Sequence, residues 1–324
     1  MGTNTKNASV RKFINQNTLT VAGVIVAYVV LAIMLYSGST SRQLSAMLVP
    51  VSCYIVLAVS LNLVVGLLGE LSLGHAGFMA VGLFSGCLFS IAAVSLPLYI
   101  RLPLAMIIGG LAAAAIGFAV GLPALRLKGD YLAIVTLACG EIIKTVILNL
   151  KVTGGALGLN TQPIYSDAKA LLPYAAVMVL ITVIAVMNLK KSRHGRAIMA
   201  IRDNRIAAES TGINVTYYKV LTFAVSAFFA GVGGSVYAHY MTAMIPTNFN
   251  FNYSAELLSE VIIGGTGSLT GSIIGAAFLS SLPELMRDFS TYRMLAYSVV
   301  LVLVMLFRPG GIFGRWEFSL TRLL

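Results

Sequence analysis

Long apolar runs separated by short polar connections dominate the chain. A helix needs about 20 apolar residues to cross the roughly 30 Å hydrocarbon layer of a membrane. Runs close to this length lie at 19–36, 45–68, 72–93, 102–122, 131–150, 171–188, 216–241 and 293–307. Closed barrels also satisfy the backbone in lipid, but their strands alternate polar and apolar residues over about ten positions. The pattern therefore predicts an all-α polytopic membrane protein with about eight transmembrane helices.

A further apolar stretch, 255–285, is interrupted at its centre. Its middle reads Gly264-Gly265-Thr266-Gly267-Ser268, and the half on either side is too short to cross the membrane alone. Irregular backbone at membrane depth occurs only where it faces protein or a watery cavity. We therefore expect a re-entrant hairpin, although the charge pattern leaves a single crossing open as the alternative.

Composition and charge agree with this class and add an orientation. Residues of the AVILMFWYC set make up 58% of the chain and charged residues 10%, against about 25% charged in a soluble domain. The formal charge of +11 indicates basic cytoplasmic connections in a membrane protein, rather than a nucleic-acid partner. Of the 22 Lys and Arg residues, 15 lie before residue 19, at 123–130, at 189–219 and after residue 307. These counts predict a cytoplasmic N-terminal tail (1–18), a transmembrane domain (19–308) and, with the hairpin, a cytoplasmic C-terminal tail (309–324).

The sequence contains few signs of catalytic chemistry. It has no G-x-x-x-x-G-K-[ST] loop, so the chain does not bind nucleotide phosphates by that route. The three cysteines lie inside apolar runs, which argues against disulfides and a zinc site. We therefore expect no catalytic residues, no metal and no cofactor in this chain, and do not expect an enzyme.

The longest polar connection, 189–216, is basic and rich in helix-forming residues. Ile198 and Ile201 share one helical face, and Arg202 and Arg205 form a basic one. Gly212 stands where a helix often ends in glycine. The sequence therefore predicts one short amphipathic helix on the cytoplasmic side. Such a helix either lies on anionic lipid or docks a cytoplasmic partner, and the residue pattern alone leaves both open.

Three other segments are candidates for a path or a docking surface. Small residues at 66–78, which include Glu70 and His75, either allow close helix packing or line a pathway. Two predicted outer loops, 151–160 and 247–254, are rich in glycine and in amide and aromatic residues, respectively. Each loop is either an ordinary surface turn or a docking site for an external protein.

Ionisable residues inside apolar runs are functional candidates by default. Glu141 and Lys144 lie three residues apart on one helical face. They form either a structural ion pair or part of a relay with His75. Glu256 and Glu260 begin the interrupted stretch, and we expect them to face the outer surface.

Several segments, in order along about 240 residues, together carry a family resemblance. They are Ser72-Leu73-Gly74-His75-Ala76-Gly77-Phe78, Gly129-Asp130-Tyr131-Leu132, Thr153-Gly154-Gly155, Ile201-Arg202-Asp203-Asn204, Ile263-Gly264-Gly265-Thr266-Gly267-Ser268 and Arg308-Pro309-Gly310-Gly311. With these segments the chain resembles the inner-membrane permeases of bacterial branched-chain amino acid ABC importers, the LivM type. The resemblance implies an ABC importer permease fold and the translocation of branched-chain amino acids.

The resemblance also implies roles for individual residues. Segment 189–215 resembles the coupling segment that docks on a cytoplasmic ATPase, although it relates only loosely to the Glu-Ala-Ala…Gly pattern of other ABC permeases. The implied coupling residues are Arg196, Ile201, Arg202, Asn204, Ala208, Glu209 and Gly212. We expect the walls of the path at Ser72, Gly74, His75, Glu141, Lys144, Gly264, Gly265 and Thr266. We expect docking of a binding protein at Gly154, Gly155, Asn248 and Asn250.

The implied partners are a second, related permease, two cytoplasmic ATPases that use the ATP, an external substrate-binding protein and the lipid of a bacterial inner membrane. Three alternatives stay open. The first is a permease for urea or short amides. The second is a self-sufficient secondary transporter or channel that uses Glu141, Lys144 and His75 as a relay. The third is a membrane scaffold that transports nothing.

Overall fold

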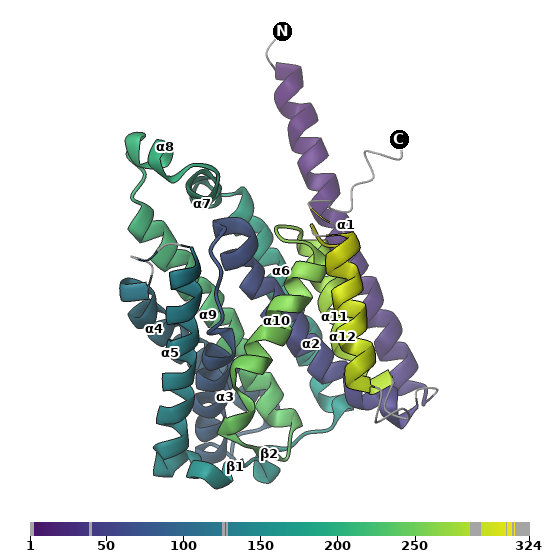
Figure 1. Ribbon diagram of the computed structural model, residues 1–324. Coiled ribbons are helices and arrows are strands. Elements are labelled where there is room, and N and C mark those ends of the chain that lie inside the picture. The colour runs from purple at the N-terminus through teal and green to yellow at the C-terminus, as the bar shows by residue number, and fades with distance from the viewer. Residues whose placement is uncertain are drawn as a thin grey trace.

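The computed structural model describes residues 3–38, 41–124, 127, 129–285, 293–308, 310–312 and 314. Most of the predicted C-terminal tail, 309–324, therefore lies outside the described residues. The helices (Figure 1) are α1 (Thr3–Tyr36), α2 (Arg42–Asn62), α3 (His75–Ala92), α4 (Leu98–Ala124), α5 (Asp130–Asn149), α6 (Ala168–Lys191), α7 (Arg193–Asp203), α8 (Arg205–Ser210), α9 (Val215–Tyr240), α10 (Phe251–Gly264), α11 (Leu269–Leu285) and α12 (Arg293–Phe307). A π-helical turn, Leu63–Leu68, extends α2. The short strands β1 (Leu159–Asn160) and β2 (Ala243–Met244) pair antiparallel.

Six helices among the described residues are long and apolar enough to cross a membrane. They are Gln43–Leu68, His75–Ala92, Leu98–Ala124, Asp130–Asn149, Ala168–Lys191 and Val215–Tyr240. Two shorter apolar helices, Thr20–Tyr36 and Leu269–Leu285, accompany them. The prediction of an all-α polytopic membrane protein is confirmed, whereas the count of about eight spans stays a prediction.

Polar side chains set where several helices begin. The caps are Ser41 of α2, Ser192 of α7, Asn204 of α8, Asn214 of α9 and Asn250 of α10, and each accepts a hydrogen bond of 3.0–3.2 Å from the backbone N–H three residues further on. A cap of this kind contributes about 1 kcal/mol. Three of these caps lie in the connection from α6 to α9, so local sequence defines the short helices there.

Glycines allow the tightest packing of the bundle, between α3, α4 and α9. A Cβ at Gly82 would collide with the backbone of Gly231. A Cβ at Gly231 would in turn meet the carbonyl oxygen of Gly109 at 2.5 Å. Ser235 Oγ donates to the Gly82 carbonyl across the same contact (3.0 Å). Small residues let helix backbones approach closely in a membrane, and here they place α9 at the centre of the fold.

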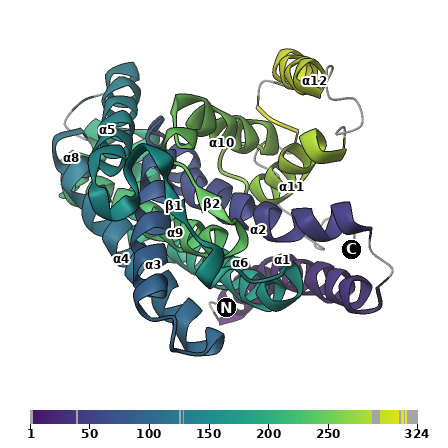
Figure 2. The same ribbon diagram turned by 90° about the horizontal axis from the view of Figure 1, so that it is seen from below.

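The two ends of the bundle differ. One end carries α7, α8, the start of α1 and the end of α12, and we call it the α7 end (Figure 1). The opposite end carries β1 and β2, and we call it the sheet end. Seen along the bundle, α3, α4, α5 and α9 lie on one side, and α10, α11 and α12 lie on the other (Figure 2). Helix α2 joins the two groups because it packs against α6, α9 and α11.

The interrupted stretch forms a hairpin of two helices. Helix α10 runs from the sheet end towards the α7 end, the chain turns at 265–268, and α11 runs back (Figure 1). Gly264 packs against Gly271, and a Cβ at Gly275 would lie 2.6 Å from the carbonyl oxygen of Glu260. The two helices are therefore antiparallel and in close contact. The predicted interruption is confirmed, while the membrane faces of the two ends stay a prediction.

Candidate functional site

The connection between α6 and α9 contains two short helices instead of the single one predicted. Helix α7 ends before Asn204, which adopts an extended conformation and caps α8 with its side chain. The single-helix prediction is wrong at this residue because an Asn side chain competes with the helix for backbone N–H groups. Gly212 follows α8 with a φ of +85°, which confirms the glycine expected at this helix end.

The predicted coupling residues divide between a buried face and an exposed one. Ile201 and Ala208 are buried against the rest of the chain, so they act within it in this conformation. The exposed members are Arg196, Asn204, Glu209 and Gly212, and Arg202 is partly buried. Glu209 pairs with Arg205 across one helical turn (Oε1–Nε 3.0 Å). Ile206 of α8 lies beside this pair and is 80% exposed. A single large apolar residue in a short polar helix is the sequence signal that could have identified it as a contact residue.

Two basic side chains reach from this connection into the membrane domain. Arg202 of α7 donates from Nη1 to the carbonyl oxygen of Gly66 in the π turn (3.0 Å). Lys190 of α6 donates from Nζ to the carbonyl oxygen of Gly267 in the hairpin turn (3.1 Å). Asn62 links the two places, because its Oδ1 accepts from the N–H of Gly267 (2.9 Å). The connection thus holds both irregular turns by direct hydrogen bonds.

The first irregular segment, 69–74, follows the π turn. Gly69 has a φ of +77°, and a Cβ there would lie 2.6 Å from Cγ of Arg202. Only glycine combines this conformation with so close an approach. Glu70 forms an ion pair with Lys219 of α9, whose side chain is 2% exposed. No local pattern in the sequence points to this pair, because its members are 149 positions apart.

Helix α3 begins inside the bundle, where the predicted path residues of this segment are enclosed. A Cβ at Gly74 would collide with the backbone of Thr136 of α5. His75 is buried, and its Nε2 lies 2.9 Å from Ser60 Oγ. The buried hydroxyl of Ser72 has no hydrogen-bond partner among the described residues. In this conformation these side chains face protein, so their role in a path stays a prediction.

The second irregular segment is the hairpin turn, which contains the other predicted wall residues. Gly264 is buried against Gly271. Gly265 has a φ of +116° and lies against the backbone of Gly314, so residues after α12 pack on the turn. Thr266 is exposed at the α7 end. Of these residues, Thr266 alone offers its side chain to a partner or to solvent in this conformation.

Glu141 and Lys144 form the ion pair that their spacing predicts. Glu141 also accepts a hydrogen bond from the backbone N–H of Phe251 (3.1 Å), which ties α5 to the start of α10. His75 bonds with a different residue, Ser60. His75 is therefore not linked to the Glu141–Lys144 pair, and the hydrogen bond from Phe251 to Glu141 fastens α5 to α10 near the sheet end.

The expectation that Glu256 and Glu260 both face the outer surface is wrong for Glu260, which is fully buried. Glu256 lies one helical turn closer to the sheet end and is partly buried. The physical reason is the packing of the hairpin, because α11 and α2 both contact α10 and Tyr54 of α2 lies within electrostatic reach of Glu260. A continuous span would leave the start of the stretch at the membrane surface.

The two predicted docking loops form one surface at the sheet end, because β1 ends the first loop and pairs with β2, which precedes the second. Gly154 and Gly155 shape the first loop with φ values of +77° and +59°. Leu157 projects from the same loop and is 91% exposed. In the second loop Asn248 is exposed, whereas the side chain of Asn250 caps α10.

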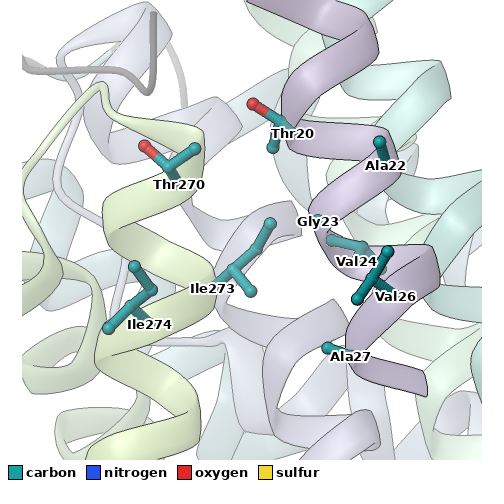
Figure 3. Close-up of a pocket in the computed structure, with 9 residues that line it drawn as sticks. All are labelled: Thr20, Ala22, Gly23, Val24, Val26, Ala27, Thr270, Ile273 and Ile274. Atoms are coloured by element: carbon teal, nitrogen blue, oxygen red, sulfur yellow. The ribbon is translucent and has the colours of Figure 1, made fainter. Parts of the chain in front are cut away.

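An apolar gap of about 520 Å³ separates α1 from α11 (Figure 3). Hydrocarbon side chains make up its walls, and Thr20 and Thr270 supply the only hydroxyls among its lining residues. Gly23 of α1 faces this gap, and a Cβ there would have nothing within 4 Å. The gap has no group that could pair with a charge, so it is unsuited to the charged end of a ligand.

The described geometry combines a helical membrane domain with a basic segment, in which Arg202 and Lys190 donate hydrogen bonds to the two irregular turns. Residues 43–308 match the family model described as "Branched-chain amino acid transport system / permease component". The chain belongs to this family. Membership of the branched-chain amino acid permease family places the chain among permease components of transport systems rather than among enzymes.

Curated relatives agree with the match. The high-affinity branched-chain amino acid transport system permease protein LivM of Escherichia coli is 37% identical over 290 residues, which cover 80% of this chain and 67% of the relative. LivM of Salmonella typhimurium has the same identity and coverage. The corresponding permease protein LivH of Escherichia coli is 30% identical over 148 residues, which cover 44% of this chain and 48% of LivH. No solved structure matches the chain.

Proposed function

We propose that this chain is a permease subunit of an ATP-binding-cassette importer that passes branched-chain amino acids across a bacterial inner membrane. The observation that carries the proposal is the pair of hydrogen bonds from Arg202 to Gly66 and from Lys190 to Gly267. A segment that docks on an ATPase must be linked to the helices that form the path. One of these bonds links the segment to each irregular turn. The substrate class is inferred from the family.

The remaining parts of the importer follow from this assignment. The α7 end is cytoplasmic and docks one of two ATPase subunits, which hydrolyse the ATP that this chain has no loop to bind. The sheet end faces outwards and receives the substrate-binding protein. A second permease completes the membrane domain, and the match of this chain to both LivM and LivH supports a pair of related subunits. ATP-driven closure of the ATPases moves α7 and α8, and the membrane domain opens alternately to the two sides.

Purification of the tagged chain from its own membranes tests this assignment. We expect a second permease and ATPases to accompany the chain. Because Ile206 is the one large apolar side chain of α7 and α8 that is exposed, Ile206→Glu should remove the ATPases and leave the second permease bound. Val94→Glu, at an exposed position between α3 and α4, is the matched control and should retain every subunit. A chain that purifies alone and moves leucine without ATP in liposomes would contradict the proposal.

The ion pair of α5 gives a separate prediction, which distinguishes an importer from a self-sufficient transporter. Glu141→Gln should change leucine uptake less than twofold, because Gln still accepts the hydrogen bond from Phe251 and a partly exposed ion pair contributes only about 0–1 kcal/mol. The measurement is uptake of labelled leucine by cells with equal amounts of the variant in the membrane. A tenfold loss would mean that Glu141 takes part in a relay.

A further inference from the structure

Glu260 of α10 is a buried carboxylate without a partner. Its exposed fraction is 0%, and neither carboxylate oxygen has a hydrogen-bond partner among the described residues. None of the ion pairs observed in that part of the chain includes it. Burial of an unpaired carboxylate is costly, and ionisable residues at membrane depth usually serve a function. The site therefore lacks a positively charged partner.

The surroundings of Glu260 belong entirely to this chain. Helix α11 approaches so closely that a Cβ at Gly275 would lie 2.6 Å from the Glu260 carbonyl oxygen. Tyr54 of α2 lies within electrostatic reach of Glu260 and of Glu256. Because this burial is complete within one protomer, a side chain of a neighbouring subunit does not reach the carboxylate in this conformation. No described residue supplies a cation to the carboxylate, so a ligand could supply one in a conformation that opens the site.

A row of aromatic rings extends from the sheet end towards Glu260. Phe84 lies 6.4 Å from Phe249, Phe249 lies 5.7 Å from Tyr253, and Tyr253 lies 5.7 Å from Tyr54, measured between ring centroids. Aromatic faces attract organic cations and also accept apolar side chains. The rings and the carboxylate together suit a ligand that has an ammonium group and a hydrocarbon part.

We propose that Glu260 binds the ammonium group of the amino acid that the permease passes through the membrane. This inference rests on the proposed function, which supplies a ligand with one cationic group and a branched hydrocarbon side chain. A metal ion fits less well, because hard cations take about six to eight oxygen ligands. Among the described residues no group of three His, Cys, Asp or Glu side chains could hold a metal. Tyr54 lies within electrostatic reach of the carboxylate, and Tyr253 stacks against Tyr54, so the two rings can receive the hydrocarbon part of the ligand.

The position of Glu260 fits a site that is closed in this conformation. It lies about 14 Å along α10 from Phe251, at about 1.5 Å per residue, and so well inside the membrane domain. Transporters commonly place their sites at such depth, next to discontinuous helices. The hairpin turn beyond Glu260 is held by Lys190 and Asn62. When α7 and α8 move, the hairpin of α10 and α11 separates from α2 and the Glu260 carboxylate becomes accessible.

The test uses the complete importer in liposomes, with ATP inside and leucine-loaded binding protein outside. In Glu260→Gln, the leucine moved per ATP hydrolysed should fall at least tenfold, while stimulation of the ATPase by loaded binding protein persists. The thermal midpoint of the complex should stay equal or rise, because an unpaired buried charge is removed. Glu284→Gln, in the other helix of the hairpin, is the matched control and should keep the wild-type ratio.

Each outcome decides between separate claims. A Glu260→Gln importer with the wild-type transport ratio would overturn the ammonium site and leave the proposed function intact. A loss of transport together with a lowered thermal midpoint would assign Glu260 to the structure of the hairpin and would also overturn the site. A wild-type importer that moves no leucine at all would instead refute the proposed function.

Discussion

Replacing Arg202 with alanine is expected to lower leucine uptake at least tenfold, while the permease and its ATPase subunits still assemble. The guanidinium of Arg202 donates to the carbonyl oxygen of Gly66 (3.0 Å) and pairs with Asp203 beside it, while the stem of its side chain lies across Gly69. A hydrogen bond to a charged group contributes about 1.5–3 kcal/mol, which corresponds to roughly a 10- to 100-fold effect. The variant breaks the link between α7 and the first irregular segment without changing the outer face of α8. We therefore expect the ATPase subunits to stay docked, while their movement no longer reaches the membrane helices.

Two measurements on one preparation check this expectation. The first is the amount of ATPase that co-purifies, and the second is leucine uptake per unit of complex. Arg193→Ala is the matched control, because Arg193 is exposed at the start of the same helix and should leave both values unchanged. If Arg202→Ala loses its ATPase subunits, Arg202 is a docking residue and the inward link is not what couples the subunits.

The two irregular segments share a local design that explains why one connection can hold both. In each, a glycine with positive φ, Gly69 or Gly265, ends one helix. In each, a serine follows three positions later, Ser72 or Ser268, and Ser268 directly precedes the next helix. The hydroxyl of Ser268 accepts from the N–H of Gly271 (3.0 Å) and so caps α11. Lys190 at the end of α6 and Arg202 of α7 each bond one of the two places, so a joint shift of the end of α6 and of α7 acts on both.

Much of the fold could be predicted because it depends on local sequence. Apolar runs predict the helices, since only regular backbone is stable in lipid. The glycine-rich centre at 264–268 predicts the interruption, and Gly212 predicts the end of a helix. The spacing of Glu141 and Lys144 predicts their ion pair. In each case the necessary residues are neighbours in the chain, or one helical turn apart, so spacing alone carries the information.

The features that could not be predicted depend on contacts between distant segments. Glu70 meets Lys219 only because α9 packs beside the first irregular segment. Lys190 belongs to a basic cluster whose other members give no reason to single it out, and its acceptor is a backbone carbonyl 77 positions away. Glu260 is buried because α11 returns along α10, and a linear pattern cannot distinguish this from a surface position. These contacts define the candidate site, so its chemistry required the fold.

Replacing Gly231 with leucine is expected to abolish the folded permease. Gly231 lies where α9 meets α4, and a Cβ there would lie 2.5 Å from the Gly109 carbonyl oxygen and 2.6 Å from Cβ of Ala113. Overpacking of a core usually costs about 1–3 kcal/mol, because flexible side chains can yield. Here the obstacles include backbone atoms of a helix that also packs against Gly82, so α3, α4 and α9 must separate together. The measurement is the fraction of the fluorescently tagged chain that elutes as a single sharp peak in mild detergent.

The same substitution at Gly23 is the matched control. Gly23 is also a glycine in a membrane helix, but it faces the apolar gap between α1 and α11, and a Cβ there meets nothing within 4 Å (Figure 3). Leucine favours a helix over glycine by up to about 1 kcal/mol, so Gly23→Leu should elute like the wild type or survive a higher temperature. Equal behaviour of the two variants would contradict the packing described for α9. A loss confined to Gly231→Leu would show that the closeness of three helices, rather than glycine content in general, holds the membrane domain together.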